Sequence, residues 1–187
     1  MHHDAAPVIT TVTDPALADE IAAVAAATFP LACPPHITAE NIAVHIAKAL
    51  NPQRFSEWIA ADDVDVIVAQ AGPDGPVIGY TLLLHRPPEA DDVRAVVPGA
   101  QITEISKMYV VPDHHGTQAS GQPAHLLMDA ALAAARQHGS TRVWLGVNRG
   151  NERAQRYYRK MGFTVAGPRT FDLNGTVEHD YVMTRTP

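Results

Sequence analysis

Apolar residues recur along the chain at two different spacings, and these spacings predict a mixture of helices and strands. Residues 64–71 and 77–85 are β-rich runs, and Pro73-Asp74-Gly75 between them favours a tight hairpin. Asp14-Pro15 provides an N-cap followed by a first-turn proline, after which apolar residues repeat at helical spacing, so a helix is expected to begin there. Pro30 and the prolines after it are expected to end that helix in a loop.

The rest of the chain predicts further helices and strands. Two helices are expected from about Thr38 and around residues 54–60, followed after the hairpin by an exposed loop over residues 86–100. Beyond this loop we expect a strand at 102–111, a helix at 123–138, a strand at 143–147, a helix at 151–161, and two final strands joined by a type I′ turn at Asn174-Gly175. This order predicts an α/β (mixed) fold, with antiparallel hairpins early and late and a strand–helix–strand crossover between them.

Length and composition limit the class of protein. A chain of 187 residues, of which 46% are hydrophobic and 18% charged, is expected to form a single domain over residues 1–187 with a well-filled core. The net charge of −6 argues against a nucleic-acid partner, and no run approaches the ~18 consecutive apolar residues of a membrane helix. Early acidic residues argue against a secretory signal, and Cys33, the one cysteine, cannot form an intrachain disulfide. These features favour a cytoplasmic protein.

Charge is distributed unevenly between the two halves of the chain. Residues 1–100 hold thirteen acidic and four basic residues, a net charge of −9, whereas residues 101–187 hold seven acidic and ten basic residues, a net charge of +3. Either this difference reflects solvated faces alone, or the C-terminal half receives an anion and the N-terminal half attracts a cation.

Two segments carry candidate chemistry. The first runs from a strand that ends at Pro112 through a glycine-bearing loop into the helix that begins at Pro123. Unpaired N–H groups and the dipole at a helix N-terminus favour an anion, although glycine before a helix is common in any fold. The second segment is the helix at 151–161, in which Tyr157 and Tyr158 diverge by about 100°. One of these tyrosines can therefore pack while the other points into a cleft, and the order of the two stays open.

Together the two segments resemble the GNAT superfamily of acyl-CoA-dependent N-acetyltransferases. The first is similar to the family's Gln/Arg-x-x-Gly-x-Gly/Ala pattern, and the second matches its Asn-x-x-Ala-x-x-x-Tyr-x-x-x-Gly-Phe pattern without a gap. The matching positions are Gln118, Gly121 and Pro123 in the first segment, and Asn151, Ala154, Tyr158, Gly162 and Phe163 in the second. Finer features, such as Thr28-Phe29 and Trp144-Leu-Gly-Val147, resemble the PaiA-type polyamine acetyltransferase branch.

The resemblance implies a GNAT-like domain with a central, mostly antiparallel twisted sheet flanked by helices. It also implies acetyl-CoA as the acetyl donor and direct transfer to a primary amine, such as a polyamine, in a ternary complex. In this family the strand before the loop splays from its neighbour, and its exposed backbone binds pantetheine. The cofactor-binding residues implied for this chain are Met108, Val110, Gln118, Ala119, Gly121, Pro123, Ala124, Asn151 and Ala154.

Two features depart from the family pattern. The loop after Pro112 is longer than usual, and Pro123, where glycine or alanine is typical, has no N–H to offer a phosphate. A competing register begins the loop at His115-Gly116-Thr117. We prefer the register at Gln118 because it places Pro123 in the first turn of the helix, where a missing donor costs least.

Transfer to an amine requires a base and an acid. An alkyl amine with a pKa of about 10.4 is almost fully protonated at pH 7, so a carboxylate near the acceptor would have to take its proton. Glu104 is the candidate base, and a salt-bridged carboxylate at a strand edge is the other interpretation. The residues expected to share its face by alternation are Ser106, Met108 and Val110. Tyr158 is the candidate acid that protonates the leaving thiolate, with Tyr157 as the packed partner.

Alternatives remain for the metal content, the acceptor and the turnover. The ten histidines show no ligand spacing such as His-Glu-x-x-His, so no metal site is expected. Trp58 and Trp144 are expected in the core. The acceptor could instead be a peptide or protein amine or an amino-sugar, and the domain could bind acyl-CoA without turnover. If two copies pair as a homodimer, the hairpin at Asn174-Gly175 is the expected contact.

Overall fold

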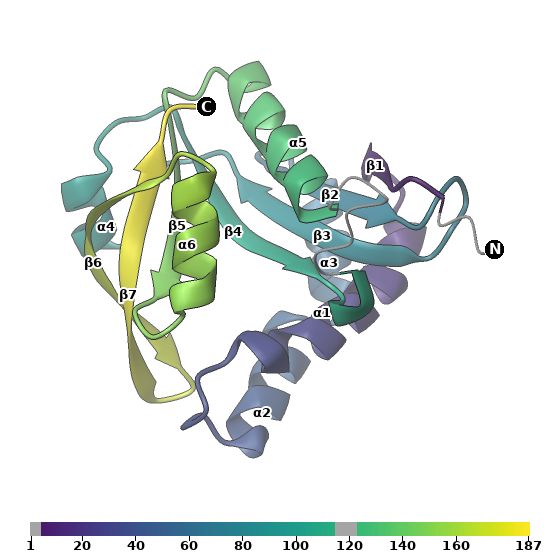
Figure 1. Cartoon of the computed structure of the whole chain (residues 1–187), viewed down its shortest axis with the longest axis horizontal. Helices are drawn as coiled ribbons and strands as arrows, with labels where there is room; N and C mark the ends of the chain where they lie inside the picture. The colour runs from purple at the N-terminus through teal and green to yellow at the C-terminus, as the bar shows by residue number, and fades with distance from the viewer. Residues whose placement is uncertain (1–4, 115–122) are drawn as a thin grey trace.

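The computed structural model describes residues 5–114 and 123–187, and these residues form a mixed α/β fold (Figure 1). The strands are β1 (Val8–Thr11), β2 (Val64–Gln70), β3 (Val77–Leu84), β4 (Ile102–Val110), β5 (Arg142–Asn148), β6 (Thr164–Leu173) and β7 (Thr176–Arg185). The helices are α1 (Ala18–Ala32), α2 (Ala39–Ala49), α3 (Pro52–Ala60), α4 (Asp91–Val96), α5 (Pro123–Gln137) and α6 (Glu152–Lys160), with 3₁₀ segments η1 (Pro15–Leu17) and η2 (Pro112–His114).

The strands of the described residues form one seven-stranded sheet in the order β1-β2-β3-β4-β5-β7-β6. Neighbouring strands are antiparallel except β4 and β5, which are parallel and pair only between Ile102–Glu104 and Arg142–Trp144. Beyond this short pairing the two strands diverge, so the sheet opens like a V with β1–β4 on one side and β5–β7 on the other (Figure 1). The predicted fold class, a mostly antiparallel sheet flanked by helices, is confirmed.

Helices cover both faces of the sheet. On one face, Leu127 and Met128 of α5 are buried in a core that also contains Leu145 of β5. On the other face, Ile21 of α1 and Phe55 of α3 are buried against strands β2 and β3. The two cores therefore lie on opposite faces of the same sheet.

Helix α1 belongs to the second of these cores. Together with η1 it forms the segment Pro15–Ala32, which is long and apolar enough to cross a membrane by length and composition alone. Ile21 and Ala25 are nevertheless fully buried against the sheet, as in the core helix of a folded domain.

Local sequence signals set the ends of several elements as predicted. Asn174 and Gly175 have φ values of 51° and 90° and join β6 to β7 in a two-residue turn, as a type I′ hairpin requires. Asp74 also has a positive φ, 58°, in the turn between β2 and β3. Gly139, with φ of 72°, follows the C-terminal end of α5.

Two segments predicted to be loops are helical instead. Helix α1 continues through Pro30 to Ala32, because this proline removes only one intrahelical bond near the end of a helix that is already held by its buried face. Within residues 86–100, α4 forms because Val93 can be buried against the sheet while acidic residues occupy the first turn, where the helix dipole favours them.

Strand β4 contains a bulge that the sequence pattern did not predict. Lys107 lies opposite Leu82 of β3 and Ile105 lies opposite Leu83, so Ser106 is an extra residue between them. Such an insertion shifts the alternation of side chains by one position in the residues that follow.

The bulge changes which side chains share a face. Glu104 lies on the same face as Lys107 and Tyr109, on the side of α1 and α3, whereas Met108 and Val110 lie on the side of α5. The prediction that Glu104 shares a face with Met108 and Val110 is therefore wrong, because simple alternation assumes an unbroken strand. Ser106, the extra residue of the bulge, has its hydroxyl oxygen 3.4 Å from Nζ of Lys107, on the face of Glu104.

Candidate active site

The opening between β4 and β5 is a cleft with a volume of about 820 Å³. Its lining comes from α1–α3 and β4 on one side and from β5, α6, β6 and β7 on the other, together with the start of α5. The whole segment from Ile105 to Val110, beyond the last position at which β4 pairs with β5, lines this cleft. Met108 and Val110, which were expected to contact pantetheine, lie on this segment.

The two adjacent tyrosines of α6 both line the cleft but differ in their hydroxyl groups. The hydroxyl of Tyr157 donates a hydrogen bond to the backbone carbonyl of Ala124 on α5 at 3.1 Å. No described residue forms a hydrogen bond with the hydroxyl of Tyr158. Burial raises the pKa of Tyr158 to about 12, so this hydroxyl keeps its proton at neutral pH. This arrangement favours Tyr158 as the tyrosine whose hydroxyl is available to donate a proton or a hydrogen bond to a bound molecule.

Glu104 lies at the point where β4 leaves β5. Burial raises the pKa of the Glu104 carboxyl, while the positive charges of Arg169 and Lys107 oppose that rise. No residue in the described parts of the chain forms a hydrogen bond or an ion pair with this carboxyl. A half-buried carboxyl with a raised pKa and no fixed partner is suited to proton transfer.

Lys107 places a second ionisable group on the same face of β4. Burial lowers the pKa of Lys107, and the nearby Glu104 opposes this effect. Nζ of Lys107 lies 5.5 Å from the centre of a Trp58 ring, and the guanidinium carbon of Arg54 lies 5.0 Å from the same side chain. Trp58, which was expected in the core, therefore packs against the core and also lines the cleft.

Two buried carboxylates of β7 line the same cleft, and the sequence analysis missed them. Asp180 accepts hydrogen bonds from Nε and Nη2 of Arg169 at 3.1 and 3.0 Å. Glu178 accepts one from Asn148 at 3.0 Å, and its other oxygen lies 2.5 Å from Nε2 of His36. Both acids occupy buried alternate positions of β7, whereas the apolar Val177 beside them is exposed, so the sequence pattern did not indicate their burial.

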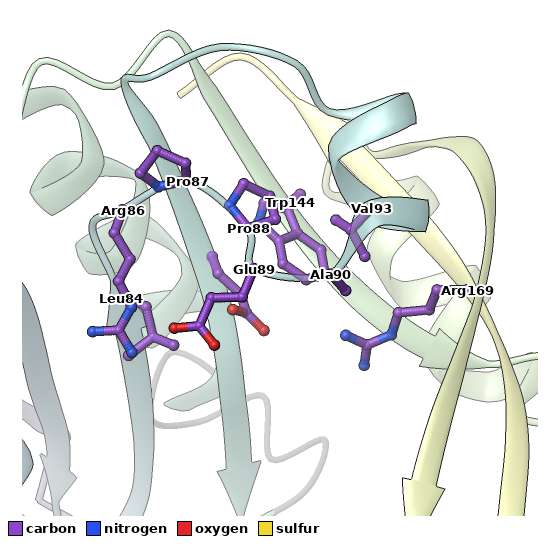
Figure 2. A pocket seen from close by; sticks show the side chains of 10 residues that line it. Leu84, Arg86, Pro87, Pro88, Glu89, Ala90, Val93, Trp144 and Arg169 are labelled. Carbon is purple, nitrogen blue, oxygen red and sulfur yellow. The ribbon is translucent and has the colours of Figure 1, made fainter.

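A smaller cavity of about 210 Å³ adjoins the cleft at Glu104 and Arg169, which line both volumes. Figure 2 shows Glu89 and Arg169 reaching into this cavity from different elements, with Trp144 behind them. Trp144 is buried against α4, in agreement with the predicted core position. The cavity thus gives Glu104 a second side from which a substrate group can approach.

The residues implied as cofactor-binding differ in what the structure says of them. Pro123 is buried as the first residue of α5, the helix position that was expected, and both Pro123 and Ala124 line the cleft. Three of the implied residues, Gln118, Ala119 and Gly121, lie outside the described residues. The alternative register at 115–117 also lies outside them.

Asn151 serves as the N-cap of α6. Its Oδ1 accepts a hydrogen bond from the backbone N–H of Ala154 at 3.1 Å, which satisfies one of the free donors of the first turn. Asn151 and Ala154 both line the cleft. A contact between the Asn151 side chain and a cofactor stays a prediction.

Comparisons with known proteins agree with this geometry. A profile of the Acetyltransferase (GNAT) family matches residues 26–163. Uncharacterized N-acetyltransferases of Mycobacterium bovis and Mycobacterium tuberculosis are 45% identical to this chain over 168 residues, which is 90% of this chain and 96% of theirs.

Solved structures show the same fold at low sequence identity. The PaiA N-acetyltransferase of Thermoplasma acidophilum, in complex with coenzyme A, superposes with a TM-score of 0.74 at 17% identity over 97% of this chain and 99% of its own. YncA of Salmonella typhimurium, solved with its cofactor acetyl-CoA, superposes with a TM-score of 0.63 at 19% identity over 96% of this chain and 93% of its own. With the family profile covering most of its length and close relatives of nearly equal extent, the chain belongs to the acetyltransferase (GNAT) family.

Proposed function

We propose that this protein transfers an acetyl group from acetyl-CoA directly to a primary amine within a ternary complex. One observation carries the proposal: the diverging segment of β4, Glu104 and Tyr158 all line one cleft of about 820 Å³. A volume of this size is usual for a site that holds a cofactor or a substrate. Two proteins of the same fold support the donor, since PaiA was solved with coenzyme A and YncA with acetyl-CoA.

The donor would lie in the opening between β4 and β5. The backbone of β4 around Met108 and Val110 faces this opening and would bond to the amide groups of pantetheine. The pyrophosphate would lie at the N-terminus of α5, where free N–H groups favour an anion. Because Pro123 has no N–H, the donors there would begin at Ala124.

Glu104 would serve as the general base. Deprotonating an alkyl amine with a pKa of about 10.4 at pH 7 costs about 4–5 kcal/mol, and a carboxylate beside the amine can take that proton directly or through water. Burial raises the pKa of Glu104, which makes it a stronger base than an exposed glutamate. Glu178 and Asp180 are less suited, because their oxygens are already engaged with neighbouring side chains.

Tyr158 would serve as the general acid. The amine nitrogen attacks the thioester carbonyl carbon, so that an N–C bond forms and the C–S bond breaks. Glu104 takes the first proton from the ammonium before the attack, and the hydroxyl of Tyr158 gives its proton to the departing sulfur. The second proton, which the nitrogen loses on becoming an amide, returns to the oxygen of Tyr158. With a pKa of about 12, this hydroxyl is protonated at neutral pH and is available to protonate the sulfur.

A polyamine is the acceptor that we propose, with peptide or protein amines and amino-sugars as alternatives. The acidic N-terminal half of the chain supports a cationic acceptor. Within the cleft Asp180 is paired with Arg169 and Glu178 is engaged with His36 and Asn148, so Glu104 is the acid with which an amine would interact. A cytoplasmic location and a homodimer that pairs at the Asn174-Gly175 hairpin stay predictions from the sequence.

Release of free thiol from acetyl-CoA tests this function when it is measured with a panel of amines. The panel contains spermidine, spermine, a peptide with a free N-terminus, a lysine peptide and an amino-sugar, and mass spectrometry identifies each acetylated product. We expect turnover with the polyamines above the other classes. Turnover with another class alone would replace the acceptor, and binding of coenzyme A without thiol release for any amine would contradict the proposed reaction.

A further inference from the structure

Three side chains from distant parts of the chain meet at the C-terminal end of α5. Asp65 lies on β2, His85 directly follows β3, and His138 directly follows α5. Oδ2 of Asp65 lies 2.9 Å from Nε2 of His85 and 3.3 Å from Nε2 of His138. Because the three positions lie far apart in the sequence, no short motif could have indicated this cluster.

We propose that Asp65, His85 and His138 bind a divalent transition-metal ion, with zinc as the expected occupant. Two imidazole nitrogens and one carboxylate oxygen suit zinc and leave a fourth position for water. The three ligand atoms lie within 4.8 Å of one another. Tetrahedral zinc with bonds of about 2.0–2.2 Å requires ligand atoms roughly 3.3 Å apart, and the separations of 2.9 and 3.3 Å between Oδ2 of Asp65 and the two histidine nitrogens are already close to this.

The surroundings of His85 resemble the outer shell of a metal ligand. Its side chain is only 3% exposed, and its Nδ1 lies 2.8 Å from Oγ1 of Thr103. Oγ1 of Thr103 in turn lies 2.7 Å from Oγ of Ser140. A histidine that binds metal through one nitrogen usually donates its other N–H to such an oxygen, which sets the orientation of the ring. The Thr103 contact thus leaves Nε2 of His85 directed at the position where the ion would lie.

An ion can reach this position from solvent, and one side chain must move to bind it. The side chains of His138 and Asp65 are 36% and 23% exposed. The rings of His85 and His138 are stacked, with centres 3.6 Å apart and planes at 7°. Two parallel rings cannot both direct a lone pair at one ion, so His138 has to rotate on binding. It can do so because it is the most exposed of the three ligands and lies beyond the last turn of α5.

The site lies at the junction of the two halves of the sheet rather than in the cleft. Thr103 belongs to the short pairing of β4 with β5, and Ser140 lies just before β5. The fifteen residues of α5 separate the cluster from the N-terminus of that helix, at the cleft, by about 22 Å. A bound ion would therefore stabilise the junction without touching the substrates. Its removal should lower the melting temperature and leave kcat nearly unchanged.

Titration of untagged, chelator-treated, full-length protein with zinc chloride tests the site directly. We expect isothermal titration calorimetry to show one ion per chain, and Co²⁺ in place of zinc to give the visible absorption of a tetrahedral complex. Zinc at about 100 times its Kd should raise the melting temperature by about 5–10 °C. These measurements do not depend on acetyl transfer, so their failure would be distinct from failure of the proposed function.

Three variants connect any binding to these residues. His138→Ala should keep the fold, as circular dichroism checks, and should lose the cobalt absorption and at least about tenfold in zinc affinity. Thr103→Val keeps all three ligands but removes the outer oxygen, and should weaken zinc binding by about 10–100-fold. His179→Ala removes an exposed histidine of β7 and should bind zinc like the unmodified protein. Absence of binding to the unmodified chain, or equal affinity in His138→Ala and His179→Ala, would overturn the proposal.

Discussion

At the scale of single residues, the adjacent tyrosines of α6 give the most direct test of the reaction. Tyr158→Phe removes the proposed acid but keeps a ring that can pack against Phe163, whose centre lies 6.0 Å away. We expect kcat to fall by about 10²–10⁴, while the affinity for acetyl-CoA changes little. Steady-state thiol release gives kcat, and calorimetric titration with coenzyme A gives the affinity.

Tyr157→Phe is the matched control for this variant. It removes the hydrogen bond to Ala124 and should lower the free energy of unfolding by about 1 kcal/mol, with kcat close to that of the unmodified enzyme. If instead Tyr157→Phe abolishes turnover and Tyr158→Phe does not, the two roles are exchanged.

Glu104 should make catalysis depend on pH. A base must be ionised to accept a proton, so kcat/KM falls as the pH drops through the pKa of Glu104. Burial raises this pKa, which places the fall at a higher pH than for an exposed glutamate. In Glu104→Gln, kcat/KM at pH 7 should be lower by about 10²–10⁴, and the acid-side fall in the pH profile should be absent.

Glu178→Gln tests whether Glu178, rather than Glu104, is the general base. The Glu178 carboxylate is hydrogen-bonded to Asn148 and His36, so we expect that its loss leaves the fall of kcat/KM at low pH in place. A profile that keeps this fall in Glu104→Gln and loses it in Glu178→Gln would assign the base to β7.

At the scale of elements, the sequence predicted best the features that depend on local chemistry. The Asn174-Gly175 turn follows from two residues that tolerate positive φ, and the start of α5 at Pro123 follows from the fixed φ of proline. The bulge at Ser106 could not be predicted in this way, since no residue there requires it and it exists only through pairing with β3. The position of Lys107 beside Glu104 therefore could not be predicted either.

Helix α6 offers a test of whether Asn151, a residue of the family motif, stabilises the helix or binds coenzyme A. Asn151→Ala should lower the free energy of unfolding by about 0.5–2 kcal/mol, because Oδ1 caps the first turn. Asn151→Ser keeps an oxygen that can cap, so we expect it to retain stability, and its affinity for coenzyme A then shows whether the side chain also contacts the cofactor. Chemical denaturation and calorimetric titration measure the two effects.

The serine variant decides between the two roles. If Asn151→Ser is as stable as the unmodified protein but binds coenzyme A much more weakly, the side chain contacts the cofactor, as the family resemblance implied. Retained affinity would instead assign Asn151 to capping alone.

At the scale of the whole molecule, the order of strands in the sheet separates the acidic N-terminal half of the chain from the basic C-terminal half. Strands β1–β3 and helices α1–α4 come from residues 1–100, with a net charge of −9, whereas β5–β7 and α6 come from residues 101–187, with a net charge of +3. Apart from α4, which packs beside β6 and against Trp144 of β5, these groups stand on opposite sides of the V (Figure 1). The uneven charge was visible in the sequence, but the opening between the groups was not, because it depends on how few positions of β4 and β5 pair.

If the acidic group attracts the acceptor, the reaction should depend on salt in a way that reveals the acceptor's charge. Raising the ionic strength from about 0.01 M to about 0.1 M shortens the Debye length from about 30 Å to about 10 Å, which screens attraction across the cleft. At saturating acetyl-CoA, we expect kcat/KM for spermidine to fall several-fold over this range, and that for a monoamine of the same chain length to fall less. Because screening acts on encounter and not on bond formation, kcat should stay constant for both amines. An equal salt dependence for the two would mean that the extra positive charges of spermidine meet no acidic surface, and the acceptor would then have to be sought among amines of single charge.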